Sequence, residues 1–362
     1  MFKTKENIIH YKKGVKYYNI AIIGVTGFVG RSILQSLIDR KFPINMLYAT
    51  ASKHSIGKKI LYGKKNSIFV QDIKNIDFSQ VDIVFFASSK LVSKRLVPKL
   101  ADLGCIIIDN SSYWRMNPDI PLVVPEINGD ILNKDSDYNI ISNPNCSTIQ
   151  MAMVLKPLQD LQKIKRVVVS TYQSVSGEGY LAIQKLFNQT DQFILKNKHL
   201  QKIDTDSSPS NDLTFNIIPE IDHIMDNGMT GEEWKMVLET QKILASDISV
   251  QATCVRVPVF IGHCEAINIE FSGPINIDDA INAMRNFPGL SIVDHMYDRK
   301  DSTYYNYKTP RTISGKDDIF VSRIRKDYTI RDGISLWCVT DNIRKGAALN
   351  AVQIAEKIIF NI

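Results

Sequence analysis

Near its N-terminus the chain reads Tyr18-Asn19-Ile20-Ala21-Ile22-Ile23-Gly24-Val25-Thr26-Gly27-Phe28-Val29-Gly30. The first six residues are largely apolar and predict a strand, and the apolar spacing over residues 33–38 predicts a helix. Gly24 permits a tight turn, Gly27 lets backbone approach a pyrophosphate, and Gly30 lets the helix pack on the strand. The spacing is GxxGxxG instead of GxGxxG, and a purely structural turn is the alternative. The succession of strand, glycine turn and helix favours dinucleotide binding.

A second predicted strand, residues 46–50, ends in Ala51-Ser52-Lys53-His54-Ser55. An NAD-preferring fold normally places an acidic residue here, to bind the ribose hydroxyls. The residues present are polar and basic, and serine hydroxyls with the Lys53 ammonium suit a 2′-phosphate that a carboxylate would repel. This loop therefore predicts NADP as the cofactor. The alternative is a solvated loop without a ligand.

Two more apolar runs, residues 82–87 and 105–109, predict buried strands joined by a helix over residues 91–103. Alternating strands and helices indicate a doubly wound parallel sheet. Arg115 follows the second run, at the carboxyl edge where such sheets bind ligands. We therefore consider Arg115 a candidate anion ligand, with an ordinary surface arginine as the alternative.

Cys146 lies in Ser142-Asn143-Pro144-Asn145-Cys146-Ser147-Thr148-Ile149-Gln150, between a predicted turn and a predicted helix. We expect Ser147 and Thr148 to cap that helix. Unpaired N–H groups and the helix dipole at its start would then favour the thiolate, which is the reactive form, and hold a developing oxyanion. A buried structural cysteine is the alternative. We place a domain boundary near this residue.

The second half of the chain changes character. Residues 166–175 predict a strand, residues 181–195 a helix, and the alternation over residues 266–271 a sheet with one covered and one wetter face. The fold class predicted for the chain is α/β: a Rossmann-type doubly wound parallel sheet with a second α+β catalytic and dimerisation domain of mainly antiparallel sheet. The small residues after Asp341 predict a C-terminal helix that packs on the first domain.

Glu232, Lys235 and His263 each have two possible interpretations. Thr230 and Glu233 have the spacing of a capping box. This leaves Glu232 and Lys235, three apart on one helical face, either to form a surface pair or to face a ligand. His263, after Gly262, lies at the expected start of a strand. Its imidazole either points into a cleft, where it could act in catalysis, or has a structural role.

Composition excludes several classes of protein. The 44 basic and 38 acidic residues in 362 leave a net charge of +6 without a basic-aromatic pattern, so we expect no nucleic-acid partner. Five scattered cysteines without CxxC spacing argue against disulfides and zinc and for the cytoplasm. No apolar run is long enough to span a membrane. Residues 1–17 are a basic extension that we expect to be poorly ordered, with an amphipathic targeting segment as the alternative.

These stretches together resemble the aspartate-β-semialdehyde dehydrogenase family, its bacterial branch most of all. The motifs keep the family's order over residues 18–355. They are Ser142–Gln150, Ser170-Thr171-Tyr172-Gln173 with Ser176-Gly177, Gly231-Glu232-Glu233-Trp234-Lys235, Arg256-Val257-Pro258-Val259-Phe260-Ile261-Gly262-His263, and Lys345-Gly346-Ala347-Ala348 with Asn350-Ala351.

The resemblance implies reduction of L-aspartyl-4-phosphate to L-aspartate 4-semialdehyde by NADPH, with release of phosphate. This is the branch point towards lysine and diaminopimelate, threonine and methionine. A thiolate divides such a displacement into easier steps because it is both a good nucleophile and a competent leaving group. The rival enzyme is N-acetyl-γ-glutamyl-phosphate reductase, whose cysteine motif differs. A thiol hydrolase would not need the glycine turn, and a non-catalytic NADP-binding module would predict loss of Cys146, His263 or Arg256.

The resemblance also implies roles for individual residues. The implied catalytic residues are Cys146 as nucleophile, His263 as general acid/base and Gln173 as the residue that orients the substrate. The implied substrate ligands are Arg256 for the carboxylate, Glu232 for the ammonium, Arg115 and Lys235 for the phosphate, and Asn145. The implied cofactor ligands are Thr26, Gly27, Phe28 and Val29 at the pyrophosphate, Ser52, His54 and Ser55 near the adenosine ribose, Ser176 and Gly177 near the nicotinamide, and Asn342. No metal is implied.

The chain departs from the family pattern at His54, where many members have arginine, and at Ser88-Ser89, where glycines are common. The first departure weakens the expected grip on the 2′-phosphate at high pH unless Lys53 replaces the arginine. The resemblance also implies a homodimer or homotetramer. It divides the chain into residues 18–145, the NADP-binding domain joined by the helix at 341–362, and residues 146–340, the catalytic and dimerisation domain.

Overall fold

The computed structural model describes residues 16–63, 66–132, 138–196, 212–293 and 307–360. The basic extension expected over residues 1–17 therefore lies almost wholly outside the described residues. In the described part of the chain, no helix is long and apolar enough to cross a membrane.

The first sheet has five strands in the order β2-β1-β5-β6-β7, and every neighbouring pair is parallel. Its strands are β1 (Tyr18–Ile23), β2 (Ile44–Thr50), β5 (Ile83–Phe86), β6 (Ile106–Asp109) and β7 (Ile140–Ser142). A small antiparallel hairpin, β3 (Lys59–Tyr62) and β4 (Asn66–Phe69), lies beside it. The predicted parallel sheet is confirmed.

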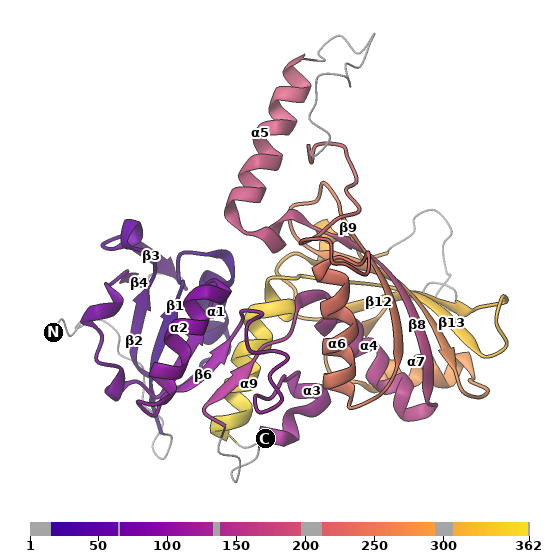
Figure 1. The fold of residues 1–362 in the computed structure, drawn as a ribbon, viewed down its shortest axis with the longest axis horizontal. Coiled ribbons are helices and arrows are strands. Elements are labelled where there is room, and N and C mark those ends of the chain that lie inside the picture. The colour runs from indigo at the N-terminus through magenta and orange to yellow at the C-terminus, as the bar shows by residue number, and fades with distance from the viewer. Residues whose placement is uncertain (1–15, 64–65, 133–137, 197–211, 294–306, 361–362) are drawn as a thin grey trace.

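Helices cover both faces of this sheet. On one face, α1 (Phe28–Asp39) and α9 (Leu349–Phe360) share a hydrophobic cluster with β1, and on the other α2 (Lys90–Ala101) packs in a separate cluster. Residues Ala351 and Ala355 of α9 are fully buried there, so the C-terminal helix packs where its small residues predicted. Figure 1 shows α9, in yellow, lying between the two halves of the molecule.

The second sheet has six strands in the order β11-β12-β13-β10-β8-β9. They are β8 (Ile164–Gln173), β9 (Ser249–Arg256), β10 (His263–Phe271), β11 (Leu290–Ile292), β12 (Ile319–Lys326) and β13 (Gly333–Thr340). The three central pairings are antiparallel and the pairing at each edge is parallel. The prediction of a mainly antiparallel sheet is confirmed, with parallel strands added at both edges.

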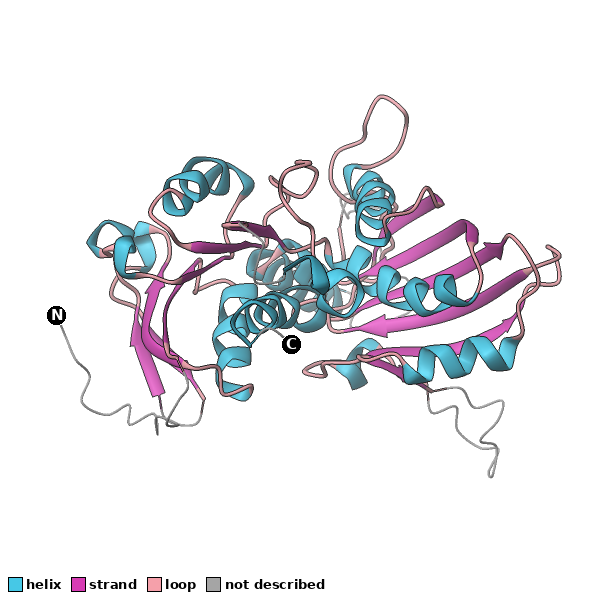
Figure 2. Ribbon diagram, turned by 90° about the horizontal axis from the view of Figure 1, so that it is seen from below, coloured by secondary structure: helices cyan, strands magenta, loops and turns pink. Residues whose placement is uncertain are grey.

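One face of the second sheet packs on helices in the largest hydrophobic cluster. These helices are α4 (Cys146–Leu161), α6 (Gly231–Leu244) and α7 (Ile277–Asn286), while α3 (Pro125–Asn128) and α8 (Pro310–Ile313) are short. Helix α5 (Tyr180–Lys196) protrudes from the body in Figure 1. Figure 2 shows the two sheets at opposite ends, with several helices between them.

The glycine turn of the first sheet has the geometry that its sequence predicts. Gly24 has a φ of +94°, and a Cβ there would lie 2.0 Å from the Ala87 oxygen. A Cβ on Gly30 would lie 2.2 Å from the Gly24 oxygen. Both positions therefore exclude any side chain because the backbone itself is in the way.

Candidate active site

Cys146 is the first residue of α4, directly after β7 and its turn. The helix is capped by Asn145, whose side-chain oxygen accepts hydrogen bonds from the N–H groups of Ser147 (3.0 Å) and Thr148 (3.2 Å). The prediction that Ser147 and Thr148 are the caps is wrong, since they provide the N–H groups that the cap binds. The predicted position of the cysteine at a helix start is confirmed.

The thiol of Cys146 differs from the other four in its exposure. All five cysteines are free, and Cys146 is partly exposed while the rest are buried. Crowding by protein atoms, followed by the negative charge of Glu232, raises the pKa of Cys146 to about 12, against the opposing effects of Arg115 and Arg256. The N–H of Ser147 at the helix start lowers the pKa of the thiol, as expected, but desolvation outweighs this contribution and the net pKa is raised.

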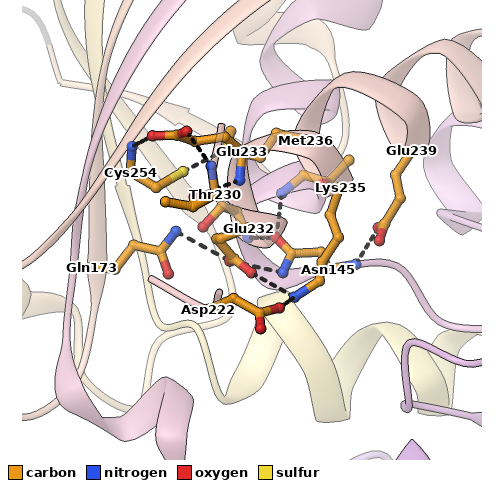
Figure 3. Close-up of polar contacts among 12 residues, drawn as sticks. Asn145, Gln173, Asp222, Thr230, Glu232, Glu233, Lys235, Met236, Glu239 and Cys254 are labelled. Carbon is orange, nitrogen blue, oxygen red and sulfur yellow. Dashed lines mark hydrogen bonds and ion pairs between the residues drawn. The ribbon is translucent and has the colours of Figure 1, made fainter. Parts of the chain in front are cut away.

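Glu232 is the centre of the polar contacts in Figure 3. Its carboxylate accepts hydrogen bonds from the side chains of Asn145 (2.9 Å), Gln173 (3.2 Å) and Lys235 (3.1 Å). Glu232 is only 5% exposed, so the interpretation as a surface pair is wrong although the two residues do pair. Lys235 also donates to Asp222 (2.7 Å). The three segments that carry Asn145, Gln173 and Glu232 are thereby joined at one carboxylate.

The capping box at the start of α6 is confirmed. Thr230 accepts a hydrogen bond from the Glu233 N–H (3.3 Å), and the Glu233 carboxylate accepts one from the Thr230 N–H (2.8 Å). Glu233 also accepts a bond from the Cys254 N–H (3.0 Å). This residue is therefore structural, and it fixes the helix from which Glu232 reaches the site.

Arg115 is buried, so the interpretation as a surface arginine is wrong. Its Nη1 donates to Glu239 (3.0 Å) and its Nη2 to the Asn110 carbonyl (3.0 Å). Its Nε has no hydrogen-bond partner among the described residues. A buried N–H without a partner costs free energy, so the unbonded Nε–H of Arg115 suits a donor that a ligand would bind. The bonds from Nη1 and Nη2 meanwhile hold the guanidinium in place.

His263 is fully buried at the start of β10. Its Nδ1 accepts a hydrogen bond from the Ser174 N–H (3.1 Å), which assigns the proton of the neutral ring to Nε2. That Nε2 has no partner within the described part of the chain. Burial and then the charge of Arg256 lower the pKa of His263 to about 3, so the ring is neutral at pH 7.

Arg256 lies at the end of β9, beside His263. Its Nη1 donates to the Ser174 carbonyl (2.7 Å) and its Nη2 to the Glu178 carboxylate (2.9 Å), while Nε has no partner among the described residues. A Cβ on Gly177 would lie 3.3 Å from the Arg256 Nη1 and 3.6 Å from the His263 Nε2. Gly177 therefore lies against both groups and leaves them room.

Ser176, expected near the nicotinamide, and Asn342, expected as a further cofactor ligand, are brought to the same place. Ser176 and Asn342 exchange hydrogen bonds of 2.9 and 3.1 Å between their side chains, and Asn342 also accepts from the Gly262 N–H (2.9 Å). Ser174 bonds both Asn342 and His263. Ser174 therefore links Ser176 and Asn342 to the imidazole, which lies two hydrogen bonds from each of them.

The residues expected at the pyrophosphate and adenosine lie at the carboxyl ends of β1 and β2. Thr26, Phe28 and Val29 are partly exposed and Gly27 is exposed, at a start of α1 that no side chain caps. A Cβ on Gly27 would meet only the Gly24 oxygen, at 3.5 Å. The N–H groups of α1 are therefore open to a phosphate, and the residues present fit a dinucleotide.

The loop after β2 is divided between surface and core. Ser52 and His54 are exposed together with Lys53, whereas Ser55 is buried. Ser52 and His54 are therefore accessible to a ligand and Ser55 is not in this arrangement. No group of three or more His, Cys, Asp or Glu side chains in the described ranges has the arrangement of a metal site.

Sequence reasoning missed four residues that the fold brings to this site. Glu239 binds Arg115, Glu178 binds Arg256, and Gly346 lies so close to Cys146 that a Cβ there would be 2.8 Å from the cysteine Cβ. Lys345 is buried beside Gly346 and pairs with Glu126 (2.7 Å). Lys345 and Gly346 belong to a family motif that assigned them no role. Glu239 had a signal in helical spacing, because it lies seven residues after Glu232 and so on the same helical face.

Comparisons with known proteins agree with this geometry. Two family models match the chain: "Semialdehyde dehydrogenase, NAD binding domain" over residues 19–134 and "Semialdehyde dehydrogenase, dimerisation domain" over residues 155–345. An aspartate-semialdehyde dehydrogenase of Rickettsia bellii is 43% identical over 344 residues, which cover 95% of this chain and 98% of that protein. One of Aquifex aeolicus is 45% identical over 344 residues, covering 94% and 98%.

Solved structures give the same result. The crystal structure of aspartate semialdehyde dehydrogenase II from Vibrio cholerae matches with a TM-score of 0.85 at 43% identity and covers 96% of this chain and 99% of that one. The predicted resemblance is confirmed over nearly the full length of both chains. This chain belongs to the aspartate-semialdehyde dehydrogenase family.

Proposed function

We propose that this chain reduces L-aspartyl-4-phosphate to L-aspartate 4-semialdehyde with NADPH and releases phosphate, through a thioester on Cys146. The step would serve the synthesis of lysine and diaminopimelate, threonine and methionine. The observation that carries the proposal is the set of buried donors without partners around a partly exposed thiol: the Nε atoms of Arg115 and Arg256 and the Nε2 of His263. Such donors suit a substrate with two anionic groups and a reacting carbonyl.

The substrate's charges match the charges that surround Cys146. Glu232 would hold the ammonium, Arg256 the carboxylate, and Arg115 with Lys235 the phosphate. Lys235 already donates to Glu232 and Asp222, which leaves one of its three protons for the phosphate. An ammonium at Glu232 would also compensate the charge that raises the pKa of Cys146, so that binding of substrate would favour the thiolate.

The acyl transfer would then take place at one sulfur atom. The Cys146 thiolate attacks the acyl phosphate carbon, the C–S bond forms, and the bond to the phosphate oxygen breaks. Gln173, held by Glu232, would orient the acyl group. NADPH, when bound by the residues of the α1 turn and by Ser176, Gly177 and Asn342, supplies the hydride.

His263 would act as a donor towards the acyl oxygen. Its ring is neutral and its Nε2–H is free, so it can stabilise the negative charge that develops on that oxygen when hydride arrives. Collapse of the tetrahedral adduct breaks the C–S bond, releases the aldehyde and returns the electron pair to the sulfur. The phosphate-dependent oxidation of the aldehyde uses the same groups in reverse.

The test is the reverse reaction, with semialdehyde, phosphate and NADP⁺, followed by the absorbance of the reduced cofactor. We expect turnover in the wild type and none in Cys146→Ala. Turnover should be normal in Cys264→Ala, which removes a buried cysteine on the face of β10 opposite to His263. Absence of turnover in the wild type, or equal turnover in wild type and Cys146→Ala, would refute the proposal.

The cofactor preference has its own test. Turnover with NADPH should exceed that with NADH, and His54→Arg should strengthen the preference at high pH because arginine keeps its charge there. A clear preference for NADH would show that the loop after β2 does not bind a 2′-phosphate.

We further propose that two copies associate through the face of the second sheet that the helices leave open. Tyr172 is exposed on that face and its ring lies 5.3 Å from that of Trp337, and the matching family model is a dimerisation domain. Light scattering should give a mass of about twice 41.0 kDa, or four times if dimers pair. A monomer would contradict this. The cytoplasmic location stays a prediction.

A further inference from the structure

Helix α6 carries a second pair of charges beyond those assigned to the substrate. Glu232, Lys235, Glu239 and Lys242 are spaced by three, four and three residues, so they lie along one face of the helix. The first two are the proposed ligands of the ammonium and the phosphate. The second two have no role in that scheme, although both reach parts of the site.

Glu239 connects two of those parts directly. Its side chain is 1% exposed, and one carboxylate oxygen accepts a hydrogen bond from the Asn145 N–H (2.6 Å) while the other accepts from the Arg115 Nη1 (3.0 Å). Figure 3 shows the contact with Asn145, the residue that caps α4 and precedes Cys146. One carboxylate therefore holds both the turn that carries the thiol and the buried guanidinium.

Lys242 holds the backbone of the arginine's loop. Its ammonium donates to the carbonyl oxygens of Arg115 (2.8 Å), Asn117 (2.7 Å) and Ile120 (2.8 Å). With the Arg115 Nη1 on Glu239 and its Nη2 on the Asn110 carbonyl, Nε is the one guanidinium nitrogen that has no partner at all among the described residues. The orientation of that free donor is thus set from α6.

We propose that Glu239 is a positioning residue that sets the distance and orientation between the Cys146 turn and the Arg115 guanidinium, with Lys242 fixing the backbone of the arginine loop. The inference rests on the proposed roles of Cys146 and Arg115. A carboxylate is required here because both contacts need an acceptor oxygen. Glutamine has the same shape but only one such oxygen, so Glu239→Gln must lose one of the two contacts.

The first experiment compares Glu239→Gln with Glu356→Gln. The control removes another glutamate that forms a bidentate pair with an arginine, Arg40 (2.6 and 2.7 Å), outside this site. In the phosphate-dependent oxidation we expect Glu239→Gln to raise the KM for phosphate at least tenfold, to lower kcat, and to change the KM for the semialdehyde less than twofold. Glu356→Gln should leave all three unchanged. An unchanged or lower KM for phosphate in Glu239→Gln would overturn the proposal.

A double-mutant cycle separates positioning from general stability. If Glu239 acts on phosphate through Arg115, then Glu239→Gln should change the KM for phosphate less than twofold in an Arg115→Ala background. Equal effects in both backgrounds would show that Glu239 does not act through the arginine, and would overturn this part of the proposal.

A third readout does not depend on turnover. We expect iodoacetamide to modify Cys146 at least twice as fast in Glu239→Gln as in wild type and Glu356→Gln, because loss of the Asn145 contact loosens the turn; mass spectrometry of the Cys146 peptide measures this. Equal modification rates would overturn the proposal that Glu239 holds the turn that carries Cys146. If the wild type lacks phosphate-dependent turnover, the proposed function fails while this readout still decides the inference.

Discussion

Cys146 combines a partly exposed position with a pKa raised to about 12, first by desolvation from the protein atoms crowded around the thiol and then by the charge of Glu232. An unfolded thiol ionises near pH 9, whereas the folded one keeps its proton to about pH 12. The unfolded state therefore binds fewer protons between these values, and this group lowers the stability of the protein as pH rises above 9. Glu232, the proposed ligand of the substrate's ammonium, thus helps to keep the thiol protonated, while Arg115 and Arg256 oppose this effect.

Glu232→Gln removes the largest charge that opposes ionisation of Cys146. We expect its iodoacetamide reaction at Cys146 to be about tenfold faster than that of wild type at pH 8, because about 1.4 kcal/mol of charge interaction is tenfold in thiolate. The rate is read from the Cys146 peptide by mass spectrometry. Glu270→Gln, which breaks a surface pair with Lys165, is the control, and a rate equal to wild type in Glu232→Gln would contradict the assignment.

Glu178 is a carboxylate that already occupies the arginine proposed for the substrate carboxylate. Its side chain is 56% exposed, whereas that of Arg256 is 5% exposed, and the two lie 2.9 Å apart. Both line a cavity of about 360 Å³ together with Glu220 and Lys185. A substrate carboxylate bound as proposed would therefore compete with Glu178 for the Nη2 of Arg256.

Removing this internal competitor should strengthen substrate binding. In Glu178→Gln we expect the KM for the semialdehyde to fall by up to about fivefold, the range that exposed ion pairs of about 0.2–1 kcal/mol allow, with kcat unchanged. Glu220→Gln, in the same cavity, is the control. Steady-state kinetics with varied semialdehyde measure this, and a higher KM in Glu178→Gln would show that Glu178 assists binding instead.

Among the secondary-structure elements, the turn of π-helix over Arg344–Ala348 lies against the start of α4. Gly346 at its centre has room for no side chain, because a Cβ would lie 2.8 Å from the Cβ and 3.3 Å from the Cα of Cys146. Single turns of π-helix occur often at functional sites. Here the turn sets how closely the C-terminal segment approaches the thiol.

Gly346→Ala should therefore displace Cys146. We expect a fall in kcat of at least about tenfold and a loss of about 1–3 kcal/mol in the free energy of unfolding, as for other overpacked sites. Gly129→Ala is a matched control, because its Cβ would meet only the flexible end of Lys357, at 3.2 Å. Kinetics and urea unfolding of both variants measure the difference. Equal kcat values would contradict the steric argument.

Over the entire chain, a buried network ties the C-terminal segment to the cysteine turn. Lys345 donates to both oxygens of Glu126 (2.8 and 2.7 Å) and to Asn350 (3.1 Å), and Asn350 in turn donates to the Asn143 side chain (2.8 Å). The residues come from α3, the π turn, α9 and the turn before α4. The network fixes segments that are some 200 residues apart in the sequence.

Replacing only one partner of the Lys345–Glu126 ion pair should lower the free energy of unfolding more than replacing both partners. Lys345→Met leaves Glu126 with an uncompensated buried charge, so we expect a loss of about 3–5 kcal/mol in the free energy of unfolding. The double variant Lys345→Met with Glu126→Gln should recover at least about 1 kcal/mol. Urea unfolding at pH 7 measures both. If the double variant were no more stable than the single one, the cost would come from packing and not from the charge.

The ion pair of Lys345 with Glu126 also makes the stability of the protein depend on pH. Lys345 is among the groups that lower the pKa of Glu126 from its ordinary value, against the burial that would raise it. The stabilisation is therefore complete above the ordinary glutamate pKa and is lost as pH falls through the lowered one. Loss of stability in acid should be smaller in the double variant than in wild type.

Much of the fold could be predicted because its signals are local. The apolar runs of β1, β5 and β6, the glycines of the α1 turn and the Thr230–Glu233 capping box each depend on neighbouring residues only. The sequence predicts the helix start at Cys146 correctly but not its cap, since Asn145 and Ser147 have similar capping tendencies. Tertiary context decided between them.

The site could be predicted only in part. The family motifs identified Cys146, His263, Arg256 and Glu232, and the fold brings these together. Glu178 had no signal, and the motif that contains Lys345 and Gly346 assigned no role to either, because the importance of each residue depends on which remote residue lies beside it. The buried state of Glu232 was likewise missed, since helical spacing gives a face but not what covers that face.

The sequence by itself determined the order of the elements, the glycine turn, the start of the helix at Cys146 and the family, because backbone sterics and short-range hydrogen bonds depend on adjacent residues. Only the tertiary structure decided the ionisation of the site. Arg115, Glu232 and Arg256 reach Cys146 from three distant segments, and burial lowers the pKa of His263. Charge interactions and desolvation depend on distances in space, which the folded chain alone establishes.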